Sequence, residues 1–309
     1  MAGAGKSKLL FFFVLLIAGI IYPQNFEGIK KINGNDIFIK TAGSGEPVVI
    51  VHGGPGLAHN YLFTPFVSNL SSSYRLIFYD QYGCGKSASF KAGDTVSIDR
   101  YVEELEGVRK EFNLDKMNLA GQSFGARIAI GYVLKYPARV KKLLLLEPSY
   151  GSSEYLKDFQ ETINKRLSQN IKNEIIALAG TEEFKQAKGE AVKKLLYLRH
   201  GAYFYDTSLA SPRQYGYFND ETGAKFMLTQ QKFTPLQLNF NIYPELPKIN
   251  TPVLIVRGEY DPINLESIKR MAGAIKDCRL IIIKNCGHYA HIEKPEEYFG
   301  CINKFLVEK

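Results

Sequence analysis

Three residues of this chain have the types, the order and the local context of a nucleophile, an acid and a base. Ser123 is the central residue of "GQSFG", residues 121–125, which follows the apolar run "MNLA" and precedes a helical pattern. A serine in a G-x-S-x-G turn between a strand and a helix is held with its Oγ exposed. Asp261 follows "PVLIVRG" and His288 follows "LIIIKN", so both stand at the ends of predicted strands. We therefore predict that His288 takes the proton of Ser123 and that Asp261 orients the imidazole ring.

Neighbouring residues offer alternatives for the acid and the base. Glu259, in the same loop as Asp261, is the second candidate acid, and His291 is the second candidate base. We favour His288 because it stands directly after a glycine at the end of a strand. Cys286 lies two residues before His288, but residues this close on a turn rarely point at one another, so a Cys/His pair is not the preferred interpretation.

The stretch "VHGGPG", residues 51–56, ends another apolar run with glycines and a proline. Acyl transfer creates an oxyanion, which needs N–H donors held in place before the reaction. Glycines let the backbone approach a substrate closely. We predict that the N–H groups of Gly54 and Phe124 form the oxyanion hole and that His52 braces the loop.

The elements around these residues alternate between strands and helices. Asn33–Gly34 predicts a hairpin turn after the N-terminal segment. Short apolar runs then predict strands covered on both faces, as in a parallel sheet: "PVVIVHG", "YRLIFYD", "MNLAGQ", "VKKLLLLEP", "TPVLIVRG" and "CRLIIIKN". Helical patterns separate them. The fold class is therefore α/β, with a doubly wound, mostly parallel sheet.

The alternation stops between residues 149 and 247, which predicts a helical cap inserted into a core of residues 26–148 and 248–309. Such an insertion lies over the carboxyl ends of the strands, where open α/β sheets bind ligands. The cap offers acids that could hold an amine and the aromatic stretch "AYFYD", residues 202–206, that could wall a slot. The acids include Glu182, Glu183, Asp206, Asp220 and Glu221.

The first 25 residues differ from the rest of the chain. Lys6 and Lys8 precede the apolar run "LLFFFVLLIAGII". The run is too short for a full membrane span and suits the hydrophobic region of a secretory signal. No small-x-small cleavage pattern follows, so an uncleaved N-terminal membrane anchor is the alternative. Either interpretation predicts export: a periplasmic, secreted or membrane-anchored protein.

The composition excludes several other classes. The 309 residues carry a formal net charge of +8, but the basic residues are dispersed, and we expect no nucleic-acid partner. The four cysteines form no CxxC pair, so we predict neither a disulfide framework nor a metal site.

The motifs "HGGPG", "DQYGCGKS", "GQSFG", "GEYDP" and "CGHYAHIEKPEEY" together resemble the α/β-hydrolase superfamily, and within it the proline iminopeptidase branch. The resemblance implies an α/β-hydrolase fold, a triad of Ser123, Asp261 and His288, and no metal or cofactor. In that branch, acidic cap residues bind the free amine of the substrate, and this chain offers no residue-by-residue match for them. The branch also usually has Arg where this chain has Tyr82, and tryptophans in the cap where this chain has none.

The predicted function is that of a serine hydrolase acting through an acyl-enzyme on a small molecule or short peptide. The resemblance implies an aminopeptidase that releases N-terminal proline. A carboxylic ester hydrolase of the same fold is the alternative. A non-catalytic binding module is more remote, because a binding protein needs neither a triad nor an oxyanion loop.

Overall fold

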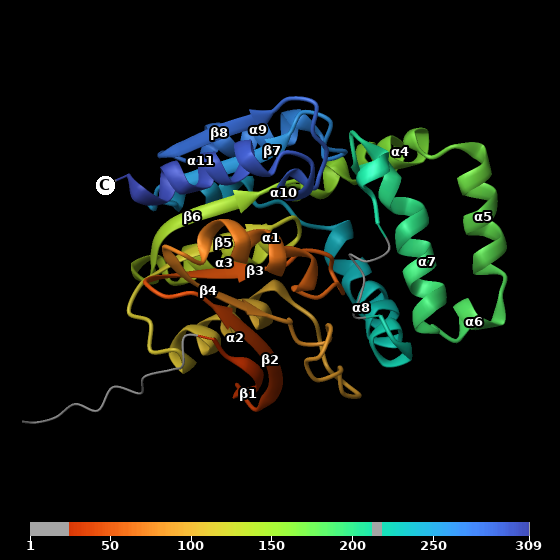
Figure 1. Ribbon diagram of the computed structural model, residues 1–309, viewed down its shortest axis with the longest axis horizontal. Coiled ribbons are helices and arrows are strands. Elements are labelled where there is room, and N and C mark those ends of the chain that lie inside the picture. The colour runs from red at the N-terminus through yellow and green to blue at the C-terminus, as the bar shows by residue number, and fades with distance from the viewer. Residues whose placement is uncertain (1–24, 212–217, 309) are drawn as a thin grey trace, which may run out of the picture.

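A computed structural model describes residues 25–211 and 218–308 of the chain, and an eight-stranded sheet runs through its centre (Figure 1). The strand order is β1-β2-β4-β3-β5-β6-β7-β8. The strands are β1 (Glu27–Ile32), β2 (Asn35–Ala42), β3 (Glu46–Val51), β4 (Tyr74–Tyr79), β5 (Met117–Gln122), β6 (Val140–Leu146), β7 (Val253–Gly258) and β8 (Cys278–Ile283). The predicted fold class is confirmed.

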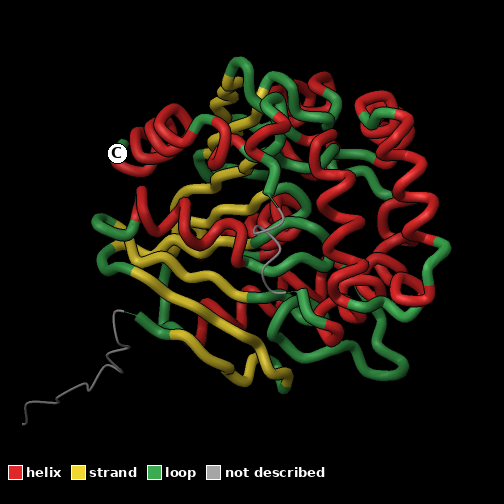
Figure 2. Tube along the Cα trace, turned by 45° about the vertical axis from the view of Figure 1, so that its right-hand side comes forward, coloured by secondary structure: helices red, strands yellow, loops and turns green. Residues whose placement is uncertain are grey.

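The first two strands form the predicted hairpin. Asn33 and Gly34 both have positive φ, at 49° and 80°, as the tight turn between β1 and β2 requires. β2 pairs antiparallel with β4, and every pair from β4 through β8 is parallel. The catalytic candidates therefore follow strands of the parallel part, whose carboxyl ends share one edge of the sheet (Figure 2).

Helices cover both faces of the sheet and make two core layers. Val49 and Val51 of β3 face one layer, whereas Val48 and Ile50 face the other, because side chains alternate along a strand. The first layer includes α2 (Ile98–Glu111), α3 (Gly125–Lys135) and α9 (Leu265–Ala274). The second includes α1 (Asn60–Leu70), α10 (Ala290–Glu293) and α11 (Pro295–Val307).

The last strand departs from the sequence prediction. The run "CRLIII" predicts a strand buried on both faces, but most of β8 is only partly buried, and Ile282 is 38% exposed. β8 is the edge strand beside β7, so no further strand covers its outer side. An apolar run alone does not distinguish a central strand from an edge strand.

The residues between β6 and β7 fold mainly as helices beside the carboxyl edge of the sheet (Figure 1). These are α4 (Leu156–Arg166), α5 (Gln169–Ala179), α6 (Glu182–Lys185), α7 (Gly189–His200) and α8 (Asp220–Leu238), which we call the cap helices. The cap helices differ in how they are attached to the sheet domain. Phe233 of α8 lies in the main core, whereas Leu178, Ala191 and Leu198 of α5 and α7 form a separate small cluster.

The predicted leader, residues 1–25, lies outside the described residues except for Asn25. Whether this leader is cleaved or kept as a membrane anchor stays a prediction. Across residues 25–211 and 218–308, no helix combines the length and the apolar character that crossing a membrane requires.

Candidate active site

The structure brings Ser123, His288 and Asp261 together in one hydrogen-bonded chain, although they lie up to 165 residues apart in sequence. The distance from His288 Nε2 to Ser123 Oγ is 3.0 Å. The distance from His288 Nδ1 to Asp261 Oδ2 is 2.9 Å. With Nδ1–H donating to the carboxylate, Nε2 is left to accept the serine proton.

The turn at Ser123 is held in a strained conformation by its neighbours. Ser123 has a φ of 53°, in the left-handed region that a non-glycine residue rarely adopts. A Cβ on Gly125 would lie 2.3 Å from the carbonyl oxygen of Val51, and a Cβ on Gly121 would lie 2.6 Å from that of Gly125. Both glycines are therefore needed for β5, α3 and β3 to meet at the serine.

Asp261 is buried and its carboxylate is fully used. Its Oδ1 accepts the N–H of Ile263 at 2.9 Å, while Oδ2 faces His288. Burial by itself would raise the pKa of Asp261, but the charge and hydrogen bond of His288, with the nearby Arg257, hold that pKa below its usual value. Arg257, at the end of β7, donates through Nη2 to the backbone oxygen of Asp261 at 3.1 Å.

The alternative residues lie elsewhere. Glu259 is exposed, and its carboxylate accepts the N–H of Asn285 at 3.4 Å. His291 is buried among tyrosine rings, and neither of its ring nitrogens has a hydrogen-bond partner among the described residues. Burial raises the pKa of the Cys286 thiol, which leaves it a poor nucleophile.

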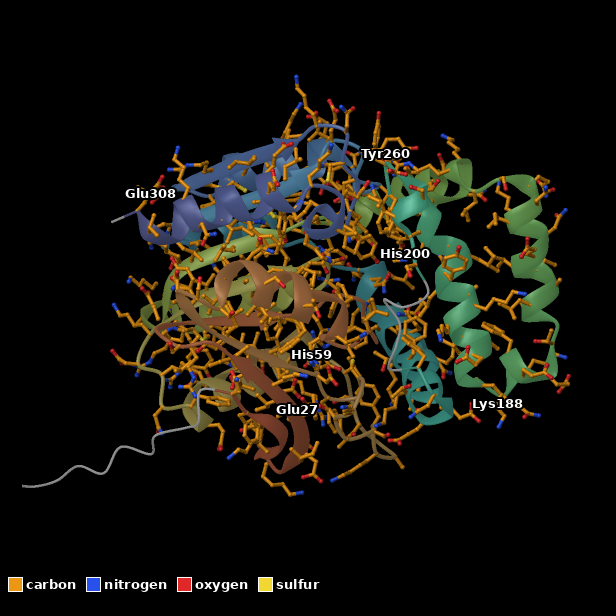
Figure 3. All side chains as sticks on the ribbon, viewed as in Figure 1. Glu27, His59, Lys188, His200, Tyr260 and Glu308 are labelled. Carbon is orange, nitrogen blue, oxygen red and sulfur yellow. The ribbon has the colours of Figure 1, made fainter. Side chains whose placement is uncertain are left out.

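His200 is the remaining histidine of the cap. It ends α7, at the junction between the cap helices and the sheet domain (Figure 3). Its ring packs edge-on against Tyr289 and Phe204, with ring centroids 4.4 and 4.8 Å apart. Burial lowers the pKa of His200 to about 3, so it is neutral at physiological pH.

The loop of residues 52–56 lies beside the serine. Gly54 has a φ of 129°, and a Cβ there would lie 2.8 Å from the nitrogen of Gly56, so the loop requires glycine at this position. Gly54 and Phe124 both line the cavity that contains Ser123. Phe124 also stands at the start of α3, where the helix dipole favours negative charge. Both residues are thus placed where an oxyanion hole would form.

His52 ties this loop to the next one. Its Nε2 accepts the N–H of Gln81 at 3.1 Å, and the Gln81 side chain donates to the His52 carbonyl at 2.7 Å. Its Nδ1 then carries the proton and donates to the carbonyl of Gly53 at 2.8 Å. Burial lowers the pKa of His52 to about 4, in keeping with a neutral bracing residue.

Sequence reasoning missed a second brace on the same loop. The N–H of Gly53 donates to the Tyr61 hydroxyl at 2.8 Å, and that hydroxyl donates to Oε1 of Gln122 at 2.7 Å. Gln122 directly precedes Ser123, so Tyr61 links the glycine loop to the nucleophile turn. Its partners lie 8 and 61 residues away in sequence, and no local pattern predicts that contact.

A cavity of about 480 Å³ opens onto Ser123 and is roofed by cap helices. Its lining includes Tyr203 of the stretch "AYFYD", whereas Phe204 is fully buried and Tyr205 is 51% exposed. None of the acids that the sequence suggested as amine ligands lines it. Three of them form ion pairs with lysines and one caps a short helix: Glu182, Asp220, Glu221 and Asp206.

Comparison with known proteins places these features in a family. Residues 46–295 match the family model described as the alpha/beta hydrolase fold. Proline iminopeptidase of Saccharolobus solfataricus is 30% identical over 286 residues, covering 91% of this chain and 92% of that protein. The crystal structure of VinJ superposes with a TM-score of 0.72 at 20% identity, covering 92% of this chain and 99% of VinJ. Proline iminopeptidase of Mycobacterium smegmatis superposes with a TM-score of 0.68 at 19% identity, covering 91% and 97% of the two chains.

Proposed function

This chain belongs to the α/β-hydrolase family, in its proline iminopeptidase branch, and on that premise we propose that it cleaves a small acyl substrate through an acyl-enzyme on Ser123. The observation that carries the proposal is the chain of contacts from Ser123 to His288 to Asp261, at 3.0 and 2.9 Å. A serine, an imidazole and a buried carboxylate in this geometry support nucleophilic acyl transfer.

The proposed reaction has two steps. His288 Nε2 takes the proton as Ser123 Oγ attacks the carbonyl carbon, and the N–H groups of Gly54 and Phe124 stabilise the oxyanion. His288 then protonates the leaving group, which departs and leaves the acyl-enzyme. In the second step His288 takes a proton from water, the hydroxide attacks the ester, and Ser123 regains its proton.

The names of the relatives support an aminopeptidase that releases an N-terminal residue from a short peptide. Proline iminopeptidases of several organisms match over most of the chain, at 24–30% identity. A cavity of about 480 Å³ suits a ligand of dipeptide size.

A carboxylic ester hydrolase is the second candidate, and one observation favours it. An aminopeptidase must hold a protonated amine, yet none of the residues that line the cavity is Asp or Glu. The structure describes every Asp and Glu of the chain, because residues 1–24, 212–217 and 309 contain none. Among the described lining residues, carbonyl, hydroxyl and amide oxygens and aromatic rings remain to bind such an amine.

A serine-directed fluorophosphonate tests the nucleophile. We expect the purified protein to be labelled once, on the peptide that contains Ser123, and the Ser123→Ala variant to stay unlabelled. Heat-unfolded protein is the control, because labelling requires the assembled triad. Labelling of the variant to the same extent would remove Ser123 from the mechanism.

A matched substrate panel tests whether the enzyme cleaves an amide bond or an ester bond. Prolyl and alanyl arylamides, their N-acetylated forms and short acyl esters are compared by kcat/KM. The aminopeptidase proposal expects cleavage of the free-amine amides and loss of that cleavage on acetylation. Turnover of the esters alone would replace it with the ester hydrolase.

A further inference from the structure

The cavity over Ser123 has an unbalanced charge. Among the residues that the structure describes, no acid lines it, but two arginines do, Arg127 and Arg199. Arg199, on α7, is exposed, whereas Arg127, on α3, is only 7% exposed. A cavity with this lining favours an anionic group on its occupant.

Arg127 lies one helical turn beyond the nucleophile and is not neutralised inside the protein. Its guanidinium stacks on Phe240, 3.6 Å from the ring centroid. One Nη2–H reaches the carbonyl of Leu236 at 3.4 Å, and the buried Nε has no partner among the described residues. Burial lowers the pKa of Arg127 to about 10, and the nearby Tyr150 hydroxyl opposes that shift only in part. Arg127 is still protonated at neutral pH, so the cavity wall carries a positive charge.

Two other buried cations have more hydrogen-bond partners within the protein than Arg127 has. Arg109 makes two hydrogen bonds to the carboxylate of Glu106, at 2.7 and 2.8 Å. Lys142 donates to three backbone carbonyls near the end of α11. A buried charge without such partners is destabilising. Arg127, whose hydrogen bond to Leu236 is 3.4 Å long, therefore has N–H donors left for a ligand in the cavity.

We propose that Arg127 is a carboxylate-binding subsite, and that the substrate carries a carboxylate in addition to the scissile carbonyl. A planar guanidinium binds a carboxylate through two parallel N–H donors, and stacking on Phe240 fixes the plane of that fork. Arg199 adds charge at the rim of the cavity. This inference rests on the proposed function, since Ser123 defines the scissile carbonyl.

Two kinds of substrate share this chemistry. One is a di- or tripeptide, whose C-terminal carboxylate lies a few bonds from the first peptide bond. The other is the half ester of a short dicarboxylic acid. Both put an anion at a fixed distance from the bond that Ser123 would attack, so both are tested as matched charged and neutral pairs.

The experiment measures binding to the Ser123→Ala variant by calorimetry, so that no turnover occurs. The pairs are Pro-Gly against Pro-Gly-amide, and monomethyl glutarate against dimethyl glutarate. We expect the carboxylate member of at least one pair to bind at least about tenfold more tightly, as a charge-assisted contact implies. Adding Arg127→Met should abolish the difference and leave binding of the neutral member unchanged. Arg127→Lys should retain part of it.

A second measurement keeps the inference testable if the Arg127 variants fail to fold. In the wild-type protein, the carboxylate member should slow fluorophosphonate labelling more than its neutral partner at equal concentration. Equal binding within both pairs, no binding of either carboxylate, or a preference that survives in Arg127→Met would overturn the subsite. Failure of the proposed function gives a different result, because an unlabelled wild-type protein can still show the binding preference.

Discussion

Replacing His291 with phenylalanine should change how the stability of this protein depends on pH. Burial, followed by the nearby His288 and His200, lowers the pKa of His291 to about 3. In the unfolded chain that pKa is about 6.5. Between these values the unfolded state binds more protons than the folded state, so this residue makes the free energy of unfolding fall as the pH falls.

The size of the effect follows from the gap in pKa. A pH of 5 is about 1.5 units below the pKa of the imidazole in the unfolded chain, and each unit corresponds to about 1.36 kcal/mol of unfolding free energy. His291 should therefore lower the free energy of unfolding by about 2 kcal/mol between pH 7.5 and pH 5. Phenylalanine fills the same aromatic site between Tyr61, Tyr289 and Tyr298 without taking up a proton.

Other groups oppose this trend, so the difference between variant and wild type is the quantity to measure. Burial raises the pKa of Glu104 to about 8, so the folded state binds more protons than the unfolded state between about pH 8 and 4.5. Glu104 should then add about 3 kcal/mol of stability on going from pH 7.5 to pH 5. Glu104→Gln should remove that gain, which makes it the control with the opposite sign.

The assay is urea unfolding followed by circular dichroism at the two pH values, since the chain has no tryptophan. We expect His291→Phe to lose about 2 kcal/mol less stability than wild type on acidification, and to retain hydrolytic activity because His291 does not contact Ser123. Equal losses in the two proteins would show that His291 is not held neutral in the fold. Loss of activity at full stability would give His291 a role in the reaction.

Three further outcomes are expected. Asp261→Asn should lower kcat by about 10⁴ with the fold intact, because it favours the wrong imidazole tautomer, and steady-state kinetics checks this. Tyr61→Phe should lower the free energy of unfolding by about 1–3 kcal/mol, since the buried N–H of Gly53 loses its acceptor, and should lower kcat more than it changes KM. Gly125→Ala should destabilise the protein by about 3 kcal/mol or more, because the new Cβ clashes with the backbone of β3. Gly273→Ala, with nothing within 4 Å of the new Cβ, should instead stabilise α9 by about 0.5–1 kcal/mol, and thermal unfolding distinguishes the two variants.

The sequence was informative where a local pattern carries the geometry. The G-x-S-x-G turn and the two strand ends predicted Ser123, Asp261 and His288, which the structure brings within hydrogen-bond distance. The choice between His288 and His291 rested only on position after a strand. Both rings are buried, and the structure separates them by their contacts. His288 lies within hydrogen-bond distance of Ser123 and Asp261, whereas the ring of His291 packs against tyrosine rings.

Contacts between distant segments escaped prediction. Tyr61 and Gln122 stand in ordinary helix and strand patterns, and only the fold brings them together. Arg127 did leave a signal, as the one charged residue in the run "GARIAIGYVL", which a buried helix would not otherwise contain. The partial exposure of β8 left no signal in the sequence, because the composition of this strand matches that of a central strand.

Because α8 is attached to the loops beside the site, it cannot be exchanged between relatives as independently as other cap helices. Its side chains reach the backbone of the loops beside the site: Gln230 donates to the carbonyl of Pro55, Thr229 to that of Gly83 at 2.9 Å, and Lys225 to that of Ser87 at 2.8 Å. Since α8 fixes the glycine loop, a chimera that exchanges it must exchange the loop as well. Helices α5 to α7 share a hydrophobic cluster of their own, so they form the segment that recombination between relatives can replace without exchanging the triad.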